Sequence, residues 1–327
     1  MSKPVRLAVL DVGANTLNLL VTSAGNAVPL PERAWKTGTR LAELSKRDGA
    51  IAPAGRQRLI TAVTQAVAEA RRAGVDEVFA YATAVVRDAP NRDRVLDEVA
   101  DATGIRLGLL TGTEEAQLTF LAARRWLGWR AGSLLLADIG GGSLEVAVGP
   151  DRLPDVALSL PLGARALTRQ YLGHHDPPPP RAVRALRHHV REQIGQVAAR
   201  AEWEAARTPV ATSKTFQQLA RLTGAPSLRR GPFVTRLLRR RELRPWLGRL
   251  ATMPVSHRAG LPGVSPHRAR QILAGSIVAY ELMRRLDLEA LQICPWALRE
   301  GIVLRRLEAD QPATDNAAWV RLRPAAS

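Results

Sequence analysis

The chain has 327 residues, of which 46% are hydrophobic and 4% aromatic, with a formal net charge of +17 at pH 7. This length is sufficient for two domains, and the single cysteine, Cys294, excludes an intrachain disulfide. Because no apolar segment reaches the length of a membrane span and no signal-peptide pattern is present, we expect a cytoplasmic protein with no membrane partner.

The positive charge is carried almost entirely by arginine and favours polyanionic partners such as polyphosphate, nucleotides or nucleic acid. It does not choose among them, and a codon bias toward arginine would produce the same excess. The choice between these partners therefore depends on the sequence motifs.

The first predicted hairpin spans residues 5–21, where an apolar strand ends in Asp11 and a second strand begins near Thr16. Gly13 and the small polar residues after it allow the backbone to turn closely around a ligand. The sequence therefore predicts a phosphate-binding turn with an aspartate at its edge.

Helices and strands alternate over residues 53–110. Helices are predicted over 53–74 and 91–103, and strands over 75–83 and 105–110. A further helix opens at Thr113, with Glu114 and Glu115 in its first turn. Two acids are more than the helix dipole requires. The alternation indicates an α/β layer structure.

A second hairpin lies at residues 134–148, and it repeats the pattern of the first. Its first strand ends in Asp138, three glycines and Ser143 form the turn, and Glu145 lies in the second strand. The turn amides can form a nest for phosphate, and two carboxylates beside a phosphate suit Mg²⁺. A plain hairpin is the alternative reading, but the earlier copy of the same pattern argues against it.

The repeat predicts two similar domains that offer their aspartates and turns to a shared cleft. This arrangement resembles the actin-like, ribonuclease-H-like pattern of phosphotransfer proteins. In the second half, helices are predicted over 181–207, 233–250 and 266–286, and strands over 208–211 and 290–294. The segment from Thr212 to Thr215 opens another helix, where its hydroxyls and Lys214 form either a phosphate site or an ordinary cap.

Six segments in this order resemble the exopolyphosphatase / guanosine pentaphosphate phosphohydrolase (Ppx/GppA) family over about residues 5–308. They are the segments at 11–16, 82–89, 112–116, 138–145, 160–164 and 298–301. The chain is most similar to the short, two-domain actinobacterial exopolyphosphatases.

The resemblance implies two actin-like (ribonuclease-H-like) α/β domains with an interdomain cleft. The expected boundaries are 1–120, completed by a C-terminal helix at about 302–312, then 121–301 and a flexible tail at 313–327. A homodimer is also implied.

The resemblance also implies roles for individual residues. Glu115 is the expected general base, and Arg87 pairs with phosphate oxygens at the catalytic centre. The expected Mg²⁺ or Mn²⁺ ligands are Asp11, Asp138 and Glu145. The expected phosphate contacts are Gly13, Asn15, Thr16, Gly141, Gly142, Ser143, Ser213 and Thr215.

Two positions depart from the family pattern in the first loop. Ala14 replaces a hydroxyl residue and Asn18 replaces a basic one. Backbone donors survive both changes, but a hydroxyl and a cation are lost, which bears on substrate preference more than on catalysis.

The expected reaction is metal-dependent hydrolysis of the terminal phosphoanhydride of inorganic polyphosphate, because such cleavage needs positioning and charge neutralisation more than covalent chemistry. Arginines of the second domain, including Arg239 to Arg241 and those of the helix at 181–207, are hypothesised to hold the chain. The alternatives are a phosphatase of guanosine pentaphosphate (pppGpp), an actin-like sugar or acetate kinase, and a non-catalytic sensor of polyphosphate or alarmone. No specific nucleic-acid partner is expected.

Overall fold

The computed structural model describes residues 5–23, 31–41, 43–46, 48–173, 175–198, 208–308 and 319–322. The chain divides into two compact units, with Met1–Thr111 and Arg299–Ser327 in unit 1 and Gly112–Leu298 in unit 2. The boundary expected at residue 120 lies at Thr111 instead, so the helix that carries Glu115 belongs to unit 2.

Unit 1 is built on a mixed sheet with the strand order β12-β4-β1-β2-β3, and β5 pairs with the outer edge of β4. Its strands are β1 (Arg6–Val12), β2 (Thr16–Ser23), β3 (Arg33–Gly38), β4 (Glu77–Ala82), β5 (Gly108–Leu109) and β12 (Trp319–Arg321). Its helices are α1 (Pro53–Arg72), α2 (Ala84–Arg87), α3 (Arg92–Thr103) and α11 (Leu298–Glu308). Of the predicted tail at 313–327 the structure describes 319–322, and β12 in this range is a strand paired with β4.

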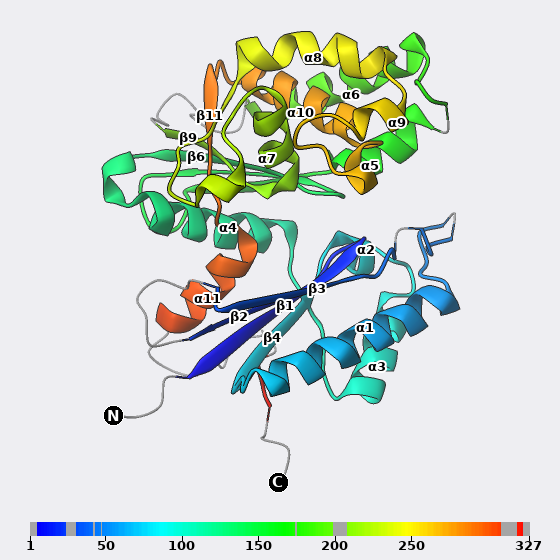
Figure 1. The fold of residues 1–327 in the computed structure, drawn as a ribbon, viewed down its shortest axis with the longest axis vertical. Coiled ribbons are helices and arrows are strands. Elements are labelled where there is room, and N and C mark those ends of the chain that lie inside the picture. Colours follow the sequence, from blue (N-terminus) through cyan, green and yellow to red (C-terminus); the bar gives the residue numbers. More distant parts are fainter. Residues whose placement is uncertain are drawn as a thin grey trace. The chain divides into compact units, whose positions relative to one another are not determined.

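The two faces of the unit 1 sheet have different roles. Ala8, Leu10 and Val12 of β1 point into a core shared with α1 and α3. Asp11 alternates with them and therefore points to the opposite face, where α11 lies (Figure 1). One face thus provides the hydrophobic core, while the other carries the aspartate.

Unit 2 contains a second mixed sheet with the strand order β10-β11-β9-β6-β7-β8. Its strands are β6 (Leu134–Ile139), β7 (Leu144–Gly149), β8 (Val156–Leu160), β9 (Thr208–Ala211), β10 (Leu237–Arg239) and β11 (Ala290–Ile293). Its helices are α4 (Gly112–Leu127), α5 (Ala164–Leu167), α6 (Pro180–Ala198), α7 (Ser213–Leu222), α8 (Arg240–Thr252), α9 (Val255–Arg258) and α10 (Ile272–Arg285). Short 3₁₀ or π turns occur at Trp129–Ala131, Thr168–Leu172, Leu228–Arg230 and Pro266–Arg268.

The unit 2 sheet repeats the division of faces. Leu135, Ala137 and Ile139 of β6 belong to a core that also contains residues of α6, α7 and α10. Asp138 alternates with them and points to the face that α4 covers (Figure 1). Each unit therefore places an aspartate at the end of its first strand, facing a single helix.

Both sheets begin with the same connections. An antiparallel β1–β2–β3 meander is followed by β4 parallel to β1, and β6–β7–β8 is likewise followed by β9 parallel to β6. The prediction of two actin-like, ribonuclease-H-like α/β domains is confirmed. The cleft between them stays a prediction.

Three helices differ from their predicted ranges. The range 233–250 was expected to be helical, but Leu237–Arg239 forms β10 because it pairs with β11 and buries Leu238. The helix expected at 266–286 begins only at Ile272, after a 3₁₀ turn. The helix expected at 181–207 is described to Ala198, and its remainder lies outside the described residues. In the described part of the chain, no helix is both long enough and apolar enough to span a membrane.

The two hairpins close with the same hydrogen bond. The amide of Gly13 donates to the carbonyl of Thr16, and the amide of Gly140 donates to that of Ser143, both at 2.9 Å. In unit 2 a second glycine, Gly163, packs directly on the turn: a Cβ at this residue would lie 2.1 Å from the carbonyl carbon of Gly142. This contact explains why the segment at 160–164 accompanies the glycine triplet in the sequence.

We predict that Gly163→Ala lowers the free energy of unfolding by about 1 to 3 kcal/mol, because the added methyl group forces two backbones apart. Gly248→Ala in α8 is the matched control, since no atom lies within 4 Å of its Cβ position. There alanine raises stability by about 0.5 to 1 kcal/mol through its helix propensity. Urea denaturation of both variants measures the difference, and equal effects would contradict the proposed backbone contact.

Candidate active site

A row of polar side chains crosses the unit 2 sheet on the face toward α4. Asp138 of β6 is the register partner of Glu145 on β7, and Glu145 is the register partner of Ser159 on β8. Register partners in antiparallel strands point to the same face, so the three side chains lie side by side. The row continues through Thr212, which follows β9 and donates its hydroxyl proton to Asp138.

The start of α4 packs on this row. Gly112, the first residue of α4, approaches so closely that a Cβ there would lie 2.3 Å from the Oγ of Ser159. Ser159 in turn donates to Oε1 of Glu145 at 2.9 Å. The first turn of α4 thereby holds Glu115 near enough for its charge to act on Glu145.

The electrostatics of the row are unfavourable to ionised carboxylates. Burial raises the pKa of Glu145 to about 8, and the negative charges of Glu115 and Asp138 act in the same direction. Burial also raises the pKa of Asp138 to about 6, although the hydrogen bond from Thr212 and the charge of Arg268 oppose this rise. Acidic groups that repel one another in this way are stabilised by a cation.

The glycine turn beside the row presents amides to an external acceptor. In the described part of the chain, the amides of Gly141, Gly142 and Ser143 donate to no other backbone group. The Ser143 hydroxyl hydrogen-bonds to Glu145. The turn carbonyls are occupied instead, because Ala164 donates to Gly140. Amides without a backbone acceptor can bind a phosphate.

The structure adds cations that the sequence did not identify. Arg268 lies near Asp138, and burial lowers the pKa of its guanidinium while the charge of Asp138 opposes this shift. Arg165 lies over the turn, because a Cβ on Gly141 would meet its Nη2 at 2.5 Å. No sequence motif adjoins Arg268, so the sequence could not have identified it as a site residue. Arg165 directly follows the family segment at 160–164, which could have identified it.

Unit 1 contains the same hairpin, with a buried aspartate at the end of its first strand, but with different charged residues around it. Asp11 is the register partner of Asn18 on β2 and of Tyr81 on β4. Burial raises the pKa of Asp11, while the charge of Arg299 and hydrogen bonds from Tyr81 and Asn18 lower it. Asn18 therefore occupies the place that Glu145 has in unit 2, and an arginine of α11 already stands beside Asp11.

The remaining predicted residues of unit 1 lie around this hairpin. Gly13 and Thr16 close the turn, and the carbonyl of Asn15 accepts from the amides of Thr39 and Arg40. Arg87 ends α2, where it donates to Asp88 at 3.0 Å and to the carbonyl of Leu110 at 2.9 Å. These contacts fix the Arg87 side chain, which is 19% exposed.

The two predicted phosphate contacts on α7 differ from each other. Ser213 starts the helix with a φ of 69°, which is uncommon for a residue other than glycine. Thr215 is buried, and its methyl group lies against Gly275 of α10. Thr215 is therefore a packing residue, and Thr212 is the hydroxyl residue of this segment that reaches the acidic row.

A resident metal was expected at Asp11, Asp138 and Glu145. Among the described residues, no group of three or more His, Cys, Asp and Glu side chains is arranged to hold a metal ion. Asp138 and Glu145 form a pair, however, and Mg²⁺ commonly takes only one or two carboxylates and completes its shell with water and phosphate oxygens. The pair fits such an ion, whereas Asp11 already has Arg299 as its cation.

The pKa of Glu145 predicts a pH dependence for the metal-free protein. In the folded state Glu145 keeps its proton up to pH about 8, while its ordinary pKa is 4.5. Between these values the folded state binds a proton that the unfolded state lacks, so stability falls as pH rises, by up to roughly 1.4 kcal/mol per unit. Urea denaturation in EDTA between pH 5 and 9 measures this slope.

Glu145→Gln should flatten the slope, because the amide does not titrate. Glu192→Gln, at an exposed position of α6, is the control and should leave the slope unchanged. The same slope in the wild type and in Glu145→Gln would contradict a raised pKa at Glu145.

Comparison with known proteins places the chain among relatives of similar length. The model of the Ppx/GppA phosphatase family matches residues 32–310. An uncharacterized protein of Streptomyces coelicolor is 51% identical over 310 residues, which are 94% of this chain and 92% of that protein. Exopolyphosphatase 1 of Mycobacterium tuberculosis is 46% identical over 312 residues, which are 95% of this chain and 90% of that protein.

The fold is also shared with a solved structure. The crystal structure of an exopolyphosphatase from Cytophaga hutchinsonii superposes with a TM-score of 0.82 at 21% identity, covering 93% of this chain and 98% of that one. At this identity the likeness concerns the fold alone. The family match over most of the chain and the high identity to full-length relatives decide the classification, and the chain belongs to the Ppx/GppA phosphatase family.

Proposed function

We propose that this protein is an exopolyphosphatase, which hydrolyses the terminal phosphoanhydride of inorganic polyphosphate and releases orthophosphate. The observation that carries the proposal is the placement of open turn amides beside a row of buried carboxylates in unit 2. The amides would bind a phosphate group, and the carboxylates would hold a metal ion beside the general base Glu115. The 46% identity to an exopolyphosphatase of M. tuberculosis supports the same substrate.

The terminal phosphate would bind to the amides of Gly141, Gly142 and Ser143. Arg268 lies on the same side of unit 2, near Asp138, and would neutralise phosphate oxygens. Phosphoanhydride cleavage depends mainly on such positioning and charge neutralisation. The hairpin turn of unit 1, with Gly13, Asn15 and Thr16, would be a second phosphate loop of the same design. Arg87 and Arg299 would contribute positive charge in that unit.

Glu115 would act as the general base. Its position on the first turn of α4 is set by the close packing of Gly112 on Ser159, which brings the Glu115 charge near Glu145. A carboxylate at this position can orient a water molecule and accept its proton as the water attacks phosphorus. The neighbouring Glu114 would only interact favourably with the dipole at the N-terminus of α4.

Asp138 and Glu145 would hold Mg²⁺ or Mn²⁺. When bound, the ion supplies charge neutralisation for phosphate oxygens. The support for this assignment is the mutual repulsion of the carboxylates at this end of the sheet, which a divalent cation relieves. We also propose that the protein is a homodimer and lies in the cytoplasm. Light scattering tests the oligomeric state.

We predict that Glu115→Gln lowers kcat for polyphosphate by about two to four orders of magnitude, which is the usual contribution of a general base. Binding of polyphosphate persists, because the amide keeps the size of the side chain and removes a negative charge. Glu114→Gln is the control and keeps kcat within about threefold. A Glu115→Gln enzyme with nearly normal turnover would exclude this residue as the base.

A phosphate-release assay separates the proposed activity from its rivals. Polyphosphates of graded length should release orthophosphate with Mg²⁺ and lose this activity with EDTA, and pppGpp should be the poorer substrate. Faster release from pppGpp would favour the alarmone phosphatase. Polyphosphate binding with no release in any metal would favour a non-catalytic sensor.

A further inference from the structure

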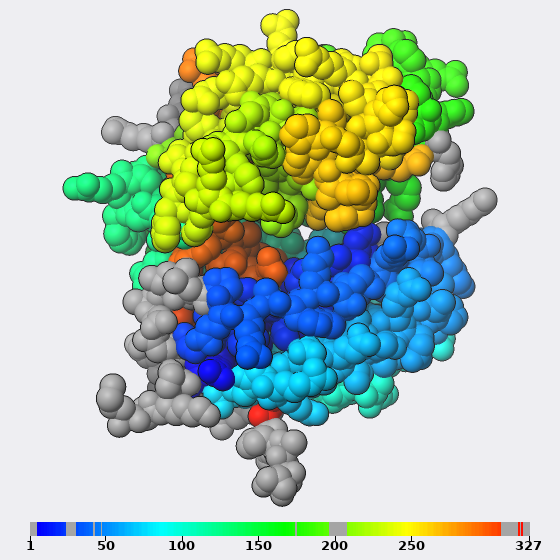
Figure 2. Space-filling view, in the orientation of Figure 1, coloured from blue at the N-terminus to red at the C-terminus, as the bar shows by residue number. Residues whose placement is uncertain are grey.

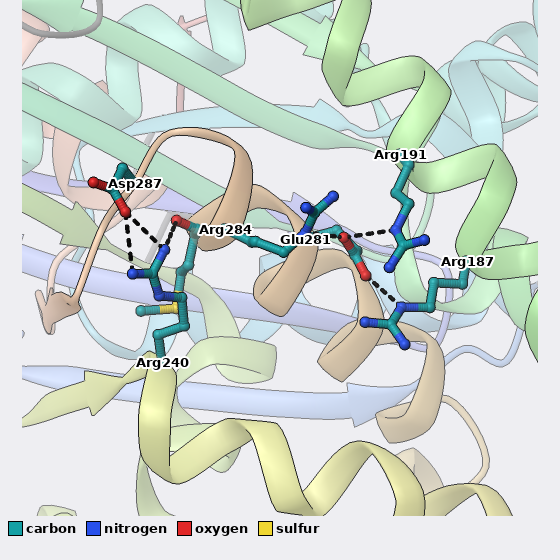
Figure 3. A network of polar contacts seen from close by, with 7 residues as sticks. Arg187, Arg191, Arg240, Glu281, Arg284 and Asp287 are labelled. Carbon is teal, nitrogen blue, oxygen red and sulfur yellow. Dashed lines mark hydrogen bonds and ion pairs between the residues drawn. The ribbon is translucent and has the colours of Figure 1, made fainter.

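Glu281 of α10 is a buried carboxylate bound by three arginines. Its side chain is 1% exposed, and its Oε1 accepts from Nε of Arg187 at 2.5 Å. Its Oε2 accepts from Nε of Arg191 at 3.0 Å and from Nε of Arg284 at 2.8 Å (Figure 3). We call Arg187, Arg191 and Arg284 the arginine triad.

The triad has more positive charge than its anchor can neutralise. Burial opposes ionisation of Glu281, but the hydrogen bonds from the arginines outweigh it and lower its pKa, so the carboxylate stays charged. One negative charge then faces three positive ones. The triad side chains are 39%, 45% and 47% exposed, so the excess charge lies at the surface.

The geometry of the three contacts leaves the outer ends of the guanidinium groups available. Each arginine binds Glu281 through Nε. No hydrogen bond of their Nη1 or Nη2 atoms to the described part of the chain is observed. An anchored guanidinium with two outward amino groups is preorganised for phosphate oxygens, because little side-chain entropy remains to be lost.

The positive surface continues beyond the triad. Arg240, the first residue of α8, donates to the carbonyl of Met283, the residue before Arg284, and to Asp287 (Figure 3). A pocket of about 300 Å³ opens beside it, lined by Arg239, Arg240, Arg241, Glu289 and Ala290. Residues of α6 and α8 reach the surface of unit 2 (Figure 2, green and yellow). A ligand that binds the triad therefore meets further cations.

We propose that the arginine triad binds the polyphosphate chain at a point remote from the terminal phosphate that is hydrolysed. The inference rests on the proposed function for the identity of the chain, and on the triad for the place where it binds. A linear polyanion fits because it presents oxygens at short, regular intervals and so can use several guanidinium groups at once. The helices of the triad, α6 and α10, pack on the core face of the unit 2 sheet, whereas Asp138 points to the opposite face. We therefore expect that a short substrate at the catalytic turn does not reach the triad.

Polyphosphate fits the triad better than a single-stranded nucleic acid. Surfaces that bind single strands combine cations with exposed aromatic side chains, on which the bases stack. Among the described residues, the aromatic ring that contacts a triad guanidinium is that of Tyr280, which is 8% exposed and lies under Arg187 at 5.7 Å from its ring centre. No base could stack on it in this position.

The test is the double variant Arg191→Gln/Arg284→Gln, which keeps Arg187 as a partner for the buried Glu281. Its KM for long-chain polyphosphate should rise about three- to thirtyfold, the loss expected for two exposed ion pairs. Its kcat, and both constants for tripolyphosphate, should stay within about twofold. Binding of the long chain should also lose about one unit of salt dependence for each arginine removed.

The matched control is Arg58→Gln/Arg71→Gln on α1, which removes the same charge from exposed positions of unit 1. A melting curve shows whether each variant is folded, and Arg284→Gln alone, with two arginines left on Glu281, should shift KM in the same direction. Equal KM values in the triad variant and the control would overturn the proposal. So would an oligonucleotide of equal charge that binds as tightly as polyphosphate and loses as much affinity in the triad variant.

Failure of the proposed function gives a different result. A wild-type enzyme that releases no phosphate from any polyphosphate would refute the activity, but calorimetric binding of the long chain would still be measurable. Weaker binding by the triad variant than by the control would then support the triad as a polyphosphate site. Equal binding would refute it.

Discussion

Two carboxylates face each other across an antiparallel pair of strands in unit 2, and the rest of the candidate site depends on this pairing. The register places Asp138 beside Glu145, and Ser159 and Thr212 bind their outer sides. Burial raises both pKa values, and the charges of Glu115 and Asp138 add to the rise at Glu145. Such a pair is stable when ionised only if a cation stands nearby, and this requirement links the fold to phosphate chemistry.

The same hairpin in unit 1 shows how one backbone can serve different electrostatic roles. Asn18 holds the register position of Glu145, and Arg299 supplies a charge next to Asp11. At these register positions the unit 1 hairpin carries one carboxylate, where the unit 2 hairpin carries two. Because of this difference we propose the metal ion for unit 2, with unit 1 binding phosphate through its turn and its arginines.

A buried carboxylate has a different role on the other face of the unit 2 sheet, where it positions arginines. Glu281 is surrounded by more arginines than it can neutralise, so it positions them and leaves most of their charge at the surface. The acidic row is the proposed site of a cation, and the triad, with its excess of positive charge, is the proposed site of an anion. Both sites are built from a charge that the fold holds in place.

The sequence by itself determined the two hairpins, their aspartates and the duplicated α/β architecture, because hydrophobic alternation and glycine turns are local signals. It also identified Glu115 and Glu145 as members of a common site, through a family resemblance. Strand β10 was missed because its pairing with β11 joins residues distant in sequence.

Only the tertiary structure decided which side chains meet. Thr215 points into the core and Thr212 to Asp138, although both lie in one four-residue segment that looked uniformly polar. Arg268 and Arg299 reach their aspartates from distant parts of the chain. Arg284 joins two arginines of α6 on the buried Glu281. Long-range contacts of this kind depend on how helices pack on the sheets, and local sequence patterns do not encode that packing.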